Sequence, residues 1–170
     1  MFLTNLFKIR YMRTWIIACC LCIFFFFLPL QCFIIGDNLG FGVQGAVFRY
    51  QMTLEGNSFI PITRELGYVT AGIYSWRSTL SVVLWTLGTI VLAATTILSL
   101  VHWNLFPHSR FKIILAGLVS ASIFYLGSCV AMYGLFLSGP AGISLPIGVI
   151  IMCLFTIFLY SYQNQFFSTD

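Results

Sequence analysis

Four long apolar runs, separated by short polar segments, are the main pattern of the chain. They cover residues 14–36, 79–103, 113–137 and 143–162, and no Asp, Glu, Lys or Arg lies inside any of them. Each run is close to the ~20 residues that a helix needs to cross a hydrocarbon core about 30 Å thick. The short connections between the last three runs favour antiparallel neighbours. The pattern predicts an all-α membrane protein, a four-helix transmembrane bundle with up-down topology, as a single domain over residues 1–170.

The long segment 37–78, between the first two runs, has a different pattern. Apolar and polar side chains alternate from Val47 to Glu55, which is typical of a half-buried strand. Glycine and polar residues then indicate a turn, and a second short strand can follow it up to Thr63. Beyond Thr63 the apolar spacing becomes helical. The segment therefore predicts an external loop that holds a small β-hairpin followed by a short surface helix.

An isolated two-stranded hairpin is marginally stable in water, so its apolar face needs a surface to lie on. The top of its own bundle, the lipid surface and a partner chain are the three alternatives. A partner chain would contact the apolar residues of the hairpin and of the surface helix. These predicted partner-binding residues are Phe48, Tyr50, Met52, Leu54, Leu66, Ile73 and Trp76.

Small residues recur along the third run, where they allow a close approach of helix backbones. Packing of this kind drives helix association in lipid, because apolar side chains gain no hydrophobic advantage over lipid tails. We interpret the stripe as the surface on which the other helices pack, with a homodimer seam as the alternative. The predicted helix-packing residues are Gly117, Ala121, Gly127, Ala131 and Gly134.

The positions of the few charges predict the orientation in a cell membrane. Only 7% of the residues are charged, and basic residues gather before the first run and in the short connection that contains Arg110 and Lys112. Lys and Arg in short loops mark the cytoplasmic side. Both termini are therefore expected in the cytoplasm, and segment 37–78 outside. No basic cluster is extensive enough for nucleic acid, so membrane lipids and another membrane or surface chain, or a second copy, are the expected partners.

The candidate reactive residues form no catalytic, metal or cofactor motif. The six cysteines all lie in the apolar runs, and no ionisable side chain lies within a run to mark an ion pathway. Arg64 and Glu65 are neighbours, which is typical of a solvated surface pair of little energetic value. We expect no cofactor and no enzymatic activity.

The layout of four spans with a large, strand-bearing first outer loop resembles that of claudin-type tetraspan proteins. Their paired loop cysteines and tryptophan-rich signature are absent, as are the loop cysteines of small disulfide-forming membrane oxidoreductases. The resemblance is therefore one of topology.

These observations predict a non-enzymatic structural or accessory membrane protein that presents its first external loop for assembly with another protein. One alternative is a small transporter or channel component with a path lined by Thr86, Thr89 and Ser120. The other is an enzyme that acts on lipid at the outer surface through Glu55, Glu65 or the Arg residues of the loop.

Overall fold

The computed structural model describes residues 15–36, 39–101, 107–139 and 141–167, with side chains omitted for 107–110 and 162–167. In these ranges the helices are Trp15–Phe26, α2 (Ile62–Thr70), α3 (Trp76–Leu100), α4 (Pro107–Tyr133) and α5 (Ile147–Phe167). The strands are β1 (Gln31–Ile35), β2 (Gly40–Gln44), β3 (Phe48–Thr53), β4 (Gly56–Pro61), β5 (Ser138–Gly139) and β6 (Gly142–Leu145).

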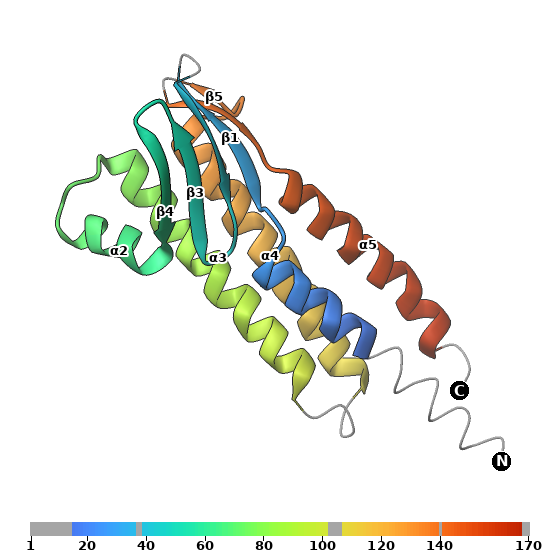
Figure 1. Cartoon of the computed structure of the whole chain (residues 1–170). Helices are drawn as coiled ribbons and strands as arrows, with labels where there is room; N and C mark the ends of the chain where they lie inside the picture. The colour runs from blue at the N-terminus through green and yellow to red at the C-terminus, as the bar shows by residue number, and fades with distance from the viewer. Residues whose placement is uncertain (1–14, 37–38, 102–106, 140, 168–170) are drawn as a thin grey trace.

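The six strands form one antiparallel sheet in the order β4-β3-β2-β1-β6-β5. It lies along one end of the helices, with its strands roughly parallel to α3 and α4 (Figure 1). The prediction of an all-α four-helix transmembrane bundle is therefore wrong, because the fold combines helices with a sheet.

The first apolar run is not one helix, because it changes structure at Pro29. A proline has no N–H and disfavours helix in the residue before it, so helix Trp15–Phe26 ends shortly before that position. The Leu30 N–H then donates to the Gln44 carbonyl at 2.8 Å, which starts the sheet. Apolar content alone could not separate these halves, since a buried strand and a membrane helix are equally hydrophobic.

The helices of the third and fourth runs are displaced along the sequence from the predicted spans 113–137 and 143–162, because α4 covers Pro107–Tyr133 and α5 covers Ile147–Phe167. Helix α4 ends at Tyr133, and Gly134 follows with a φ of +87°, the left-handed conformation that commonly terminates helices. The fourth run begins as strand β6, and α5 starts only after Pro146. Strand β6 pairs with β1, so the last connection of the chain joins the sheet built by the long loop.

The segment predicted as a hairpin contains β3 and β4, which pair from Phe48–Pro61 to Thr53–Gly56. The prediction of an isolated two-stranded hairpin is wrong, because β2 and β1 extend the same sheet. Helix α2 ends at Thr70, so Ile73 lies in the connection to α3 and Trp76 is the first residue of α3.

Two helices of the described residues are long and apolar enough to cross a membrane. They are α3 and the part of α4 from Phe111 to Tyr133, with mean hydropathies of 2.0 and 2.1. Helix Trp15–Phe26 and the part Ile147–Ser161 of α5 are apolar but shorter. The span predicted over 79–103 thus corresponds to α3, while residues 102–106 lie outside the described ranges.

Helices α3 and α4 pack closely along their length. Trp85 and Leu92 of α3 and Leu118 and Ala121 of α4 are fully buried in the core. Ser81 and Ser128 face each other across the seam, and each hydroxyl donates to the other residue's carbonyl, at 3.0 and 2.9 Å. These paired bonds set the relative height of the two helices.

The tightest point of the seam yields a stability prediction. A Cβ added to Gly117 would lie 2.1 Å from Thr95 Oγ1, and this hydroxyl already bonds to the Val91 carbonyl at 2.8 Å. We expect Gly117→Ala to destabilise the fold by about 1–3 kcal/mol through overpacking. The measurement is the unfolding midpoint of the purified protein in detergent.

Gly127→Ala is the matched control on the same helix, because its added Cβ comes no closer than 3.4 Å to Leu84. It should be neutral, or stabilising by up to about 1 kcal/mol through helix propensity. Thr95→Ala should restore part of the loss in the Gly117→Ala protein. Equal midpoints for the two glycine variants would contradict the proposed close packing.

Candidate functional site: the outer face of the sheet

The sheet turns its apolar face away from the helices. Sheets that pack on a core normally bury apolar side chains and expose polar ones. Here Gln31, Gln44 and Ser144 are buried against the helices, while Phe41 and Met52 are 46% and 47% exposed. This inverted arrangement leaves an exposed apolar surface across five strands.

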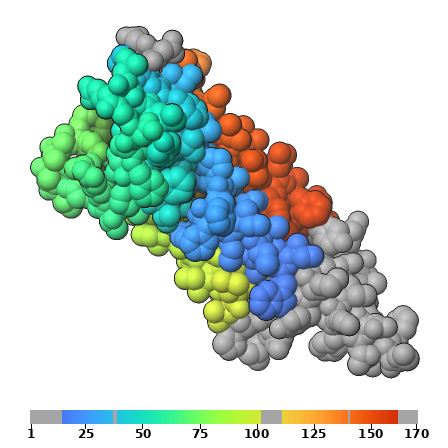
Figure 2. Space-filling view, in the orientation of Figure 1, coloured from blue at the N-terminus to red at the C-terminus, as the bar shows by residue number. Residues whose placement is uncertain are grey.

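The strand register arranges this surface in two rows, which we call the outer ladder. One row lies at the end of the sheet next to helix Trp15–Phe26 and α5, and its residues are Leu145, Cys32, Val43, Tyr50 and Phe59. The other row lies two residues farther along each strand, and its residues are Ile143, Ile34, Phe41, Met52 and Asn57. Figure 2 shows this side of the molecule, where the surface of the strands continues onto helix Trp15–Phe26 and α5. The ladder carries no charged side chain.

A buried polar network holds the inner face of the sheet on the helices. The Gln44 side-chain carbonyl accepts from the Gln31 amide at 2.7 Å and from Arg49 Nη2 at 3.0 Å. The Gln31 carbonyl accepts from the Cys129 thiol of α4 at 2.7 Å and from the Ser144 hydroxyl at 3.0 Å. The network thus connects β1, β2, β3, β6 and α4.

Arg49 extends the network to α2. Its guanidinium lies between the rings of Phe33 and Trp85, 5.8 and 5.6 Å from their centroids, and Nη1 is 2.9 Å from Glu65 Oε1. Glu65 is fully buried. The expectation of a solvated charge at Glu65 is therefore wrong, because the helix turns this carboxylate toward the sheet rather than toward water.

Tyr74 completes the environment of Glu65. Its hydroxyl donates to Glu65 Oε2 at 2.6 Å, and its ring packs edge-on against Tyr68 at 5.7 Å. Burial raises the pKa of the Tyr74 phenol above its usual value, and the bond to Glu65 raises it further. The phenol therefore remains a hydrogen-bond donor throughout the physiological pH range.

Two side chains of α3 fix the β2–β3 turn. The Trp85 indole N–H donates to the Gly45 carbonyl at 3.0 Å, and the Thr89 hydroxyl donates to the Ala46 carbonyl at 2.6 Å. Both bonds are buried, where a lost partner is costly. They anchor the end of the sheet nearest the middle of α3.

The predicted partner-binding residues fall on different surfaces. Tyr50 and Met52 belong to the outer ladder, and Phe48 follows on the same face, with its ring stacked on Phe59 at 5.4 Å. Leu54 is 88% exposed in the β3–β4 turn. The other three lie elsewhere: Leu66 on α2, half-buried, and Ile73 and Trp76, exposed, beyond that helix.

The sequence did not identify the ladder residues on β1, β2 and β6, because two of these strands lie within apolar runs. In β2 a signal was present: Phe41 and Val43 alternate with Gly40, Gly42 and Gln44. Gly42 is required there, since a Cβ would lie 2.2 Å from the ring of Phe33.

The predicted helix-packing residues also have separate environments. Ala121 is fully buried, and Gly117 and Gly127 face α3 through Thr95 and Leu84. Ala131 is half-buried, and Gly134 lies beyond the end of α4 with open space around it.

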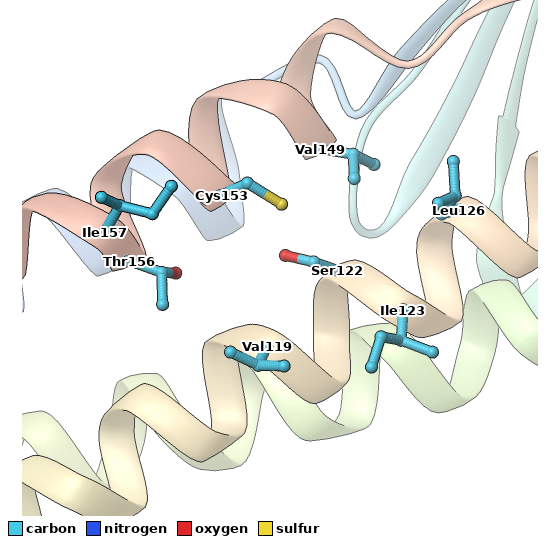
Figure 3. A pocket seen from close by; sticks show the side chains of 8 residues that line it. All are labelled: Val119, Ser122, Ile123, Leu126, Val149, Cys153, Thr156 and Ile157. Atoms are coloured by element: carbon cyan, nitrogen blue, oxygen red, sulfur yellow. The ribbon is translucent and has the colours of Figure 1, made fainter. Parts of the chain in front are cut away.

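A groove of about 290 Å³ lies between α4 and α5 (Figure 3). Both hydroxyls that line the groove already form hydrogen bonds within their own helices. Ser122 donates to the Leu118 carbonyl at 2.8 Å, and Thr156 donates to the Met152 carbonyl at 2.7 Å. The wall of the groove is therefore apolar, and the Cys153 sulfur points into the groove.

Comparisons with protein-family models, with curated proteins and with solved structures found no match to this chain. Among the described residues, no three His, Cys, Asp or Glu side chains are grouped so that they could hold a metal ion. The function must therefore be inferred from the geometry of the sheet.

The buried ion pair gives a prediction about stability. Glu65→Gln should lower the free energy of unfolding by about 3–5 kcal/mol, because it leaves the enclosed Arg49 charge without its counter-charge. Glu55→Gln makes the same chemical change at an exposed position and should alter stability by less than about 0.5 kcal/mol.

Denaturant unfolding in detergent measures both effects. The double variant Arg49→Met/Glu65→Leu should be more stable than Glu65→Gln, since apolar groups of similar volume remove both charges together. If Glu65→Gln and Glu55→Gln unfold at the same denaturant concentration, the ion pair does not hold α2 to the sheet.

Proposed function

We propose that this protein is a non-enzymatic integral membrane protein that presents the outer face of its sheet for assembly with another protein chain. The inverted sheet carries the proposal. Large contiguous apolar patches on a protein surface mark sites of contact with other proteins or with the membrane. A ladder of this kind across five strands is a surface that a partner can cover.

The apolar helices support insertion in a membrane. Helices α3 and α4 form an antiparallel pair, and their outward side chains are apolar: Ile90 and Ile97 of α3 and Ile123 of α4 are each about 60% exposed. Exposed side chains of this type suit lipid. The pair would cross the bilayer with the sheet on the extracellular side and Lys112 on the cytoplasmic side.

The two alternative functions receive less support from the side-chain contacts. Thr86, named for a polar path, bonds to the Val82 carbonyl at 2.8 Å, and Thr89 bonds to the β2–β3 turn. Glu65, named as a catalytic carboxylate, is enclosed by Arg49 and Tyr74. These groups already have partners within the fold.

The orientation is tested with single added cysteines and a membrane-impermeant maleimide on intact cells, with the parent chain as baseline. Glu55→Cys, in the β3–β4 turn, should gain label from outside. Lys112→Cys, at the opposite end of the helix pair, should gain label only after permeabilisation, because the bilayer shields it. Outside labelling of Lys112→Cys would contradict the proposed orientation.

Assembly through the ladder is tested by photo-crosslinking in native membranes. A benzoylphenylalanine at Phe41, in the centre of the ladder, should yield a discrete protein adduct of defined mass. The same replacement at Phe136 should not, although this residue is 93% exposed, because it lies outside the ladder. Adducts with lipid alone at position 41 would contradict a protein partner.

A further inference from the structure

We propose that Arg49 forms a carboxylate-binding site, which the chain fills with its own Glu65, and that α2 is a hinged lid that opens when a carboxylate of another molecule replaces Glu65. The site lies on the inner side of the sheet, so its occupancy is independent of the outer ladder and of the partner proposed there. Three features support it: the construction of the site, the fit of its present occupant and the weak attachment of α2.

The construction of the site places the cation without help from α2. Arg49 donates to the side-chain carbonyl of Gln44 from Nε at 3.2 Å and from Nη2 at 3.0 Å. The rings of Phe33 and Trp85, on β1 and α3, lie 5.8 and 5.6 Å from the guanidinium carbon. The remaining nitrogen, Nη1, faces Glu65. The sheet and α3 therefore fix the guanidinium, and Nη1 is in position for an anion.

The present occupant identifies the ligand class, and it fits imperfectly. Glu65 Oε2 accepts from the Tyr74 hydroxyl at 2.6 Å, and Oε1 lies 2.9 Å from Arg49 Nη1. This second contact is not aligned as a hydrogen bond, and Oε1 has no other donor among the described residues. Buried acceptors are normally hydrogen-bonded, and charge-assisted bonds to carboxylates are strong. A carboxylate that is not carried on a helix can turn to accept from Nη1, and so gain a bond that Glu65 does not form.

Helix α2 is attached to the fold mainly through this carboxylate. Among its nine residues, all of them described, Glu65 is the only buried one. A helix of this length is not stable by itself in water. Its N-cap residue, Pro61, makes no side-chain hydrogen bond to the helix, and its last turn has no basic residue. Segments with few buried contacts open locally while the rest of a protein stays folded. We therefore expect α2 to separate as a unit when Glu65 leaves Arg49.

The surroundings of α2 allow this movement. The Ile62 N–H donates to the Val47 carbonyl at 2.9 Å and keeps the first residue of the helix on the sheet. At the other end Gly72 has a φ of +69°, a left-handed conformation that glycine adopts at no steric cost. A Cβ added to Gly67 or Gly72 would meet no atom within 4 Å, so these positions face open space. The helix can therefore turn about Ile62 and carry its carboxylate away from the sheet.

Competition between two carboxylates sets the position of the lid. Glu65 is tethered beside Arg49, and a group on a short flexible tether acts at an effective concentration of about millimolar. A carboxylate of another molecule must exceed this value or add contacts of its own. Without the Glu65 carboxylate, the site should accept small acids directly.

The test follows hydrogen exchange of the α2 amides in the full chain, purified in detergent. In the parent chain these amides should exchange at least tenfold faster than those of β3, because α2 opens while the sheet stays folded. Sodium acetate at about 0.5 M, far above the effective concentration of Glu65, should speed α2 exchange at least twofold relative to sodium chloride. Acetamide, its neutral isostere, should have no effect.

The Glu65→Ala chain should respond to acetate in the opposite direction. Its α2 amides should exchange at least tenfold faster than in the parent chain, because the helix has lost its anchor. Acetate supplies the atoms that this substitution removes and should slow the exchange at least fivefold. The response should disappear when Arg49→Met is added. Glu55→Ala, at an exposed position, is the matched control and should behave as the parent chain does.

A short peptide with a free carboxyl end, compared with its amide, identifies the source of the carboxylate. If the acid and not the amide acts as acetate does, the site accepts the end of a polypeptide; if acetate alone acts, the site is limited to small acids.

Three outcomes would overturn the inference. Equal exchange rates for α2 and β3 in the parent chain would show that α2 opens only with the whole fold. No change with acetate in the parent chain, or an equal change with acetamide, would exclude a carboxylate site. Both measurements stand even if Glu65→Ala does not fold. None of these results bears on the crosslink at Phe41, so the failure of the lid and the failure of the proposed function are distinguishable.

Discussion

The packing of the sheet against the helices depends on the burial of one charge, that of Arg49. Its guanidinium bonds to Gln44, pairs with Glu65 and lies between two aromatic rings. Removing a charge from water is costly, and the cost is offset only when the charge keeps good partners. The partners of Arg49 come from β2, α2, β1 and α3, so these elements must be assembled together for the charge to be stable.

This constraint explains why the sheet is inverted. A strand alternates its side chains between two faces, so placing Arg49 inward also places Tyr50 and Met52 outward. The register then aligns Gln44 and Gln31 beside Arg49 on the inner face and Val43 and Cys32 beside Tyr50 on the outer face. One polar network on the hidden side thereby fixes the composition of the exposed side over five strands.

The sequence allowed some of this organisation to be predicted. The alternation after Val47 marked a strand with the correct two faces, and the apolar run at 79–103 marked α3. The first and fourth spans failed at Pro29 and Pro146, where an apolar run passes between strand and helix without a change in hydropathy. Proline was the available signal at both positions, because a residue without an N–H commonly marks the boundary of a helix.

The candidate surface could be predicted only in part, for a different reason. Periodicity identifies which residues share a face, but it does not say which face is covered. The usual inference assigns the apolar face to the core. It fails here because the polar partners of Arg49 come from separate parts of the chain. Gln44 lies on the neighbouring strand, and Glu65, next to Arg64 in sequence, pairs with a residue sixteen positions earlier.

The inverted sheet also has consequences for recognition. In the described strands, the side-chain hydrogen bonds of Gln31, Gln44 and Arg49 hold the sheet from its inner face. The outer ladder is therefore held in shape before any partner arrives, and little conformational entropy remains to be lost on binding. An apolar surface without charges attracts many partners but distinguishes them poorly. Selection among partners must then come from the boundary of the ladder. There Asn57 ends the row that contains Phe41 and Met52, and Glu55 lies exposed in the adjoining turn. Charges at the rim of an interface act mainly on specificity and association rate. The apolar ladder supplies contact area, and the polar rim supplies discrimination.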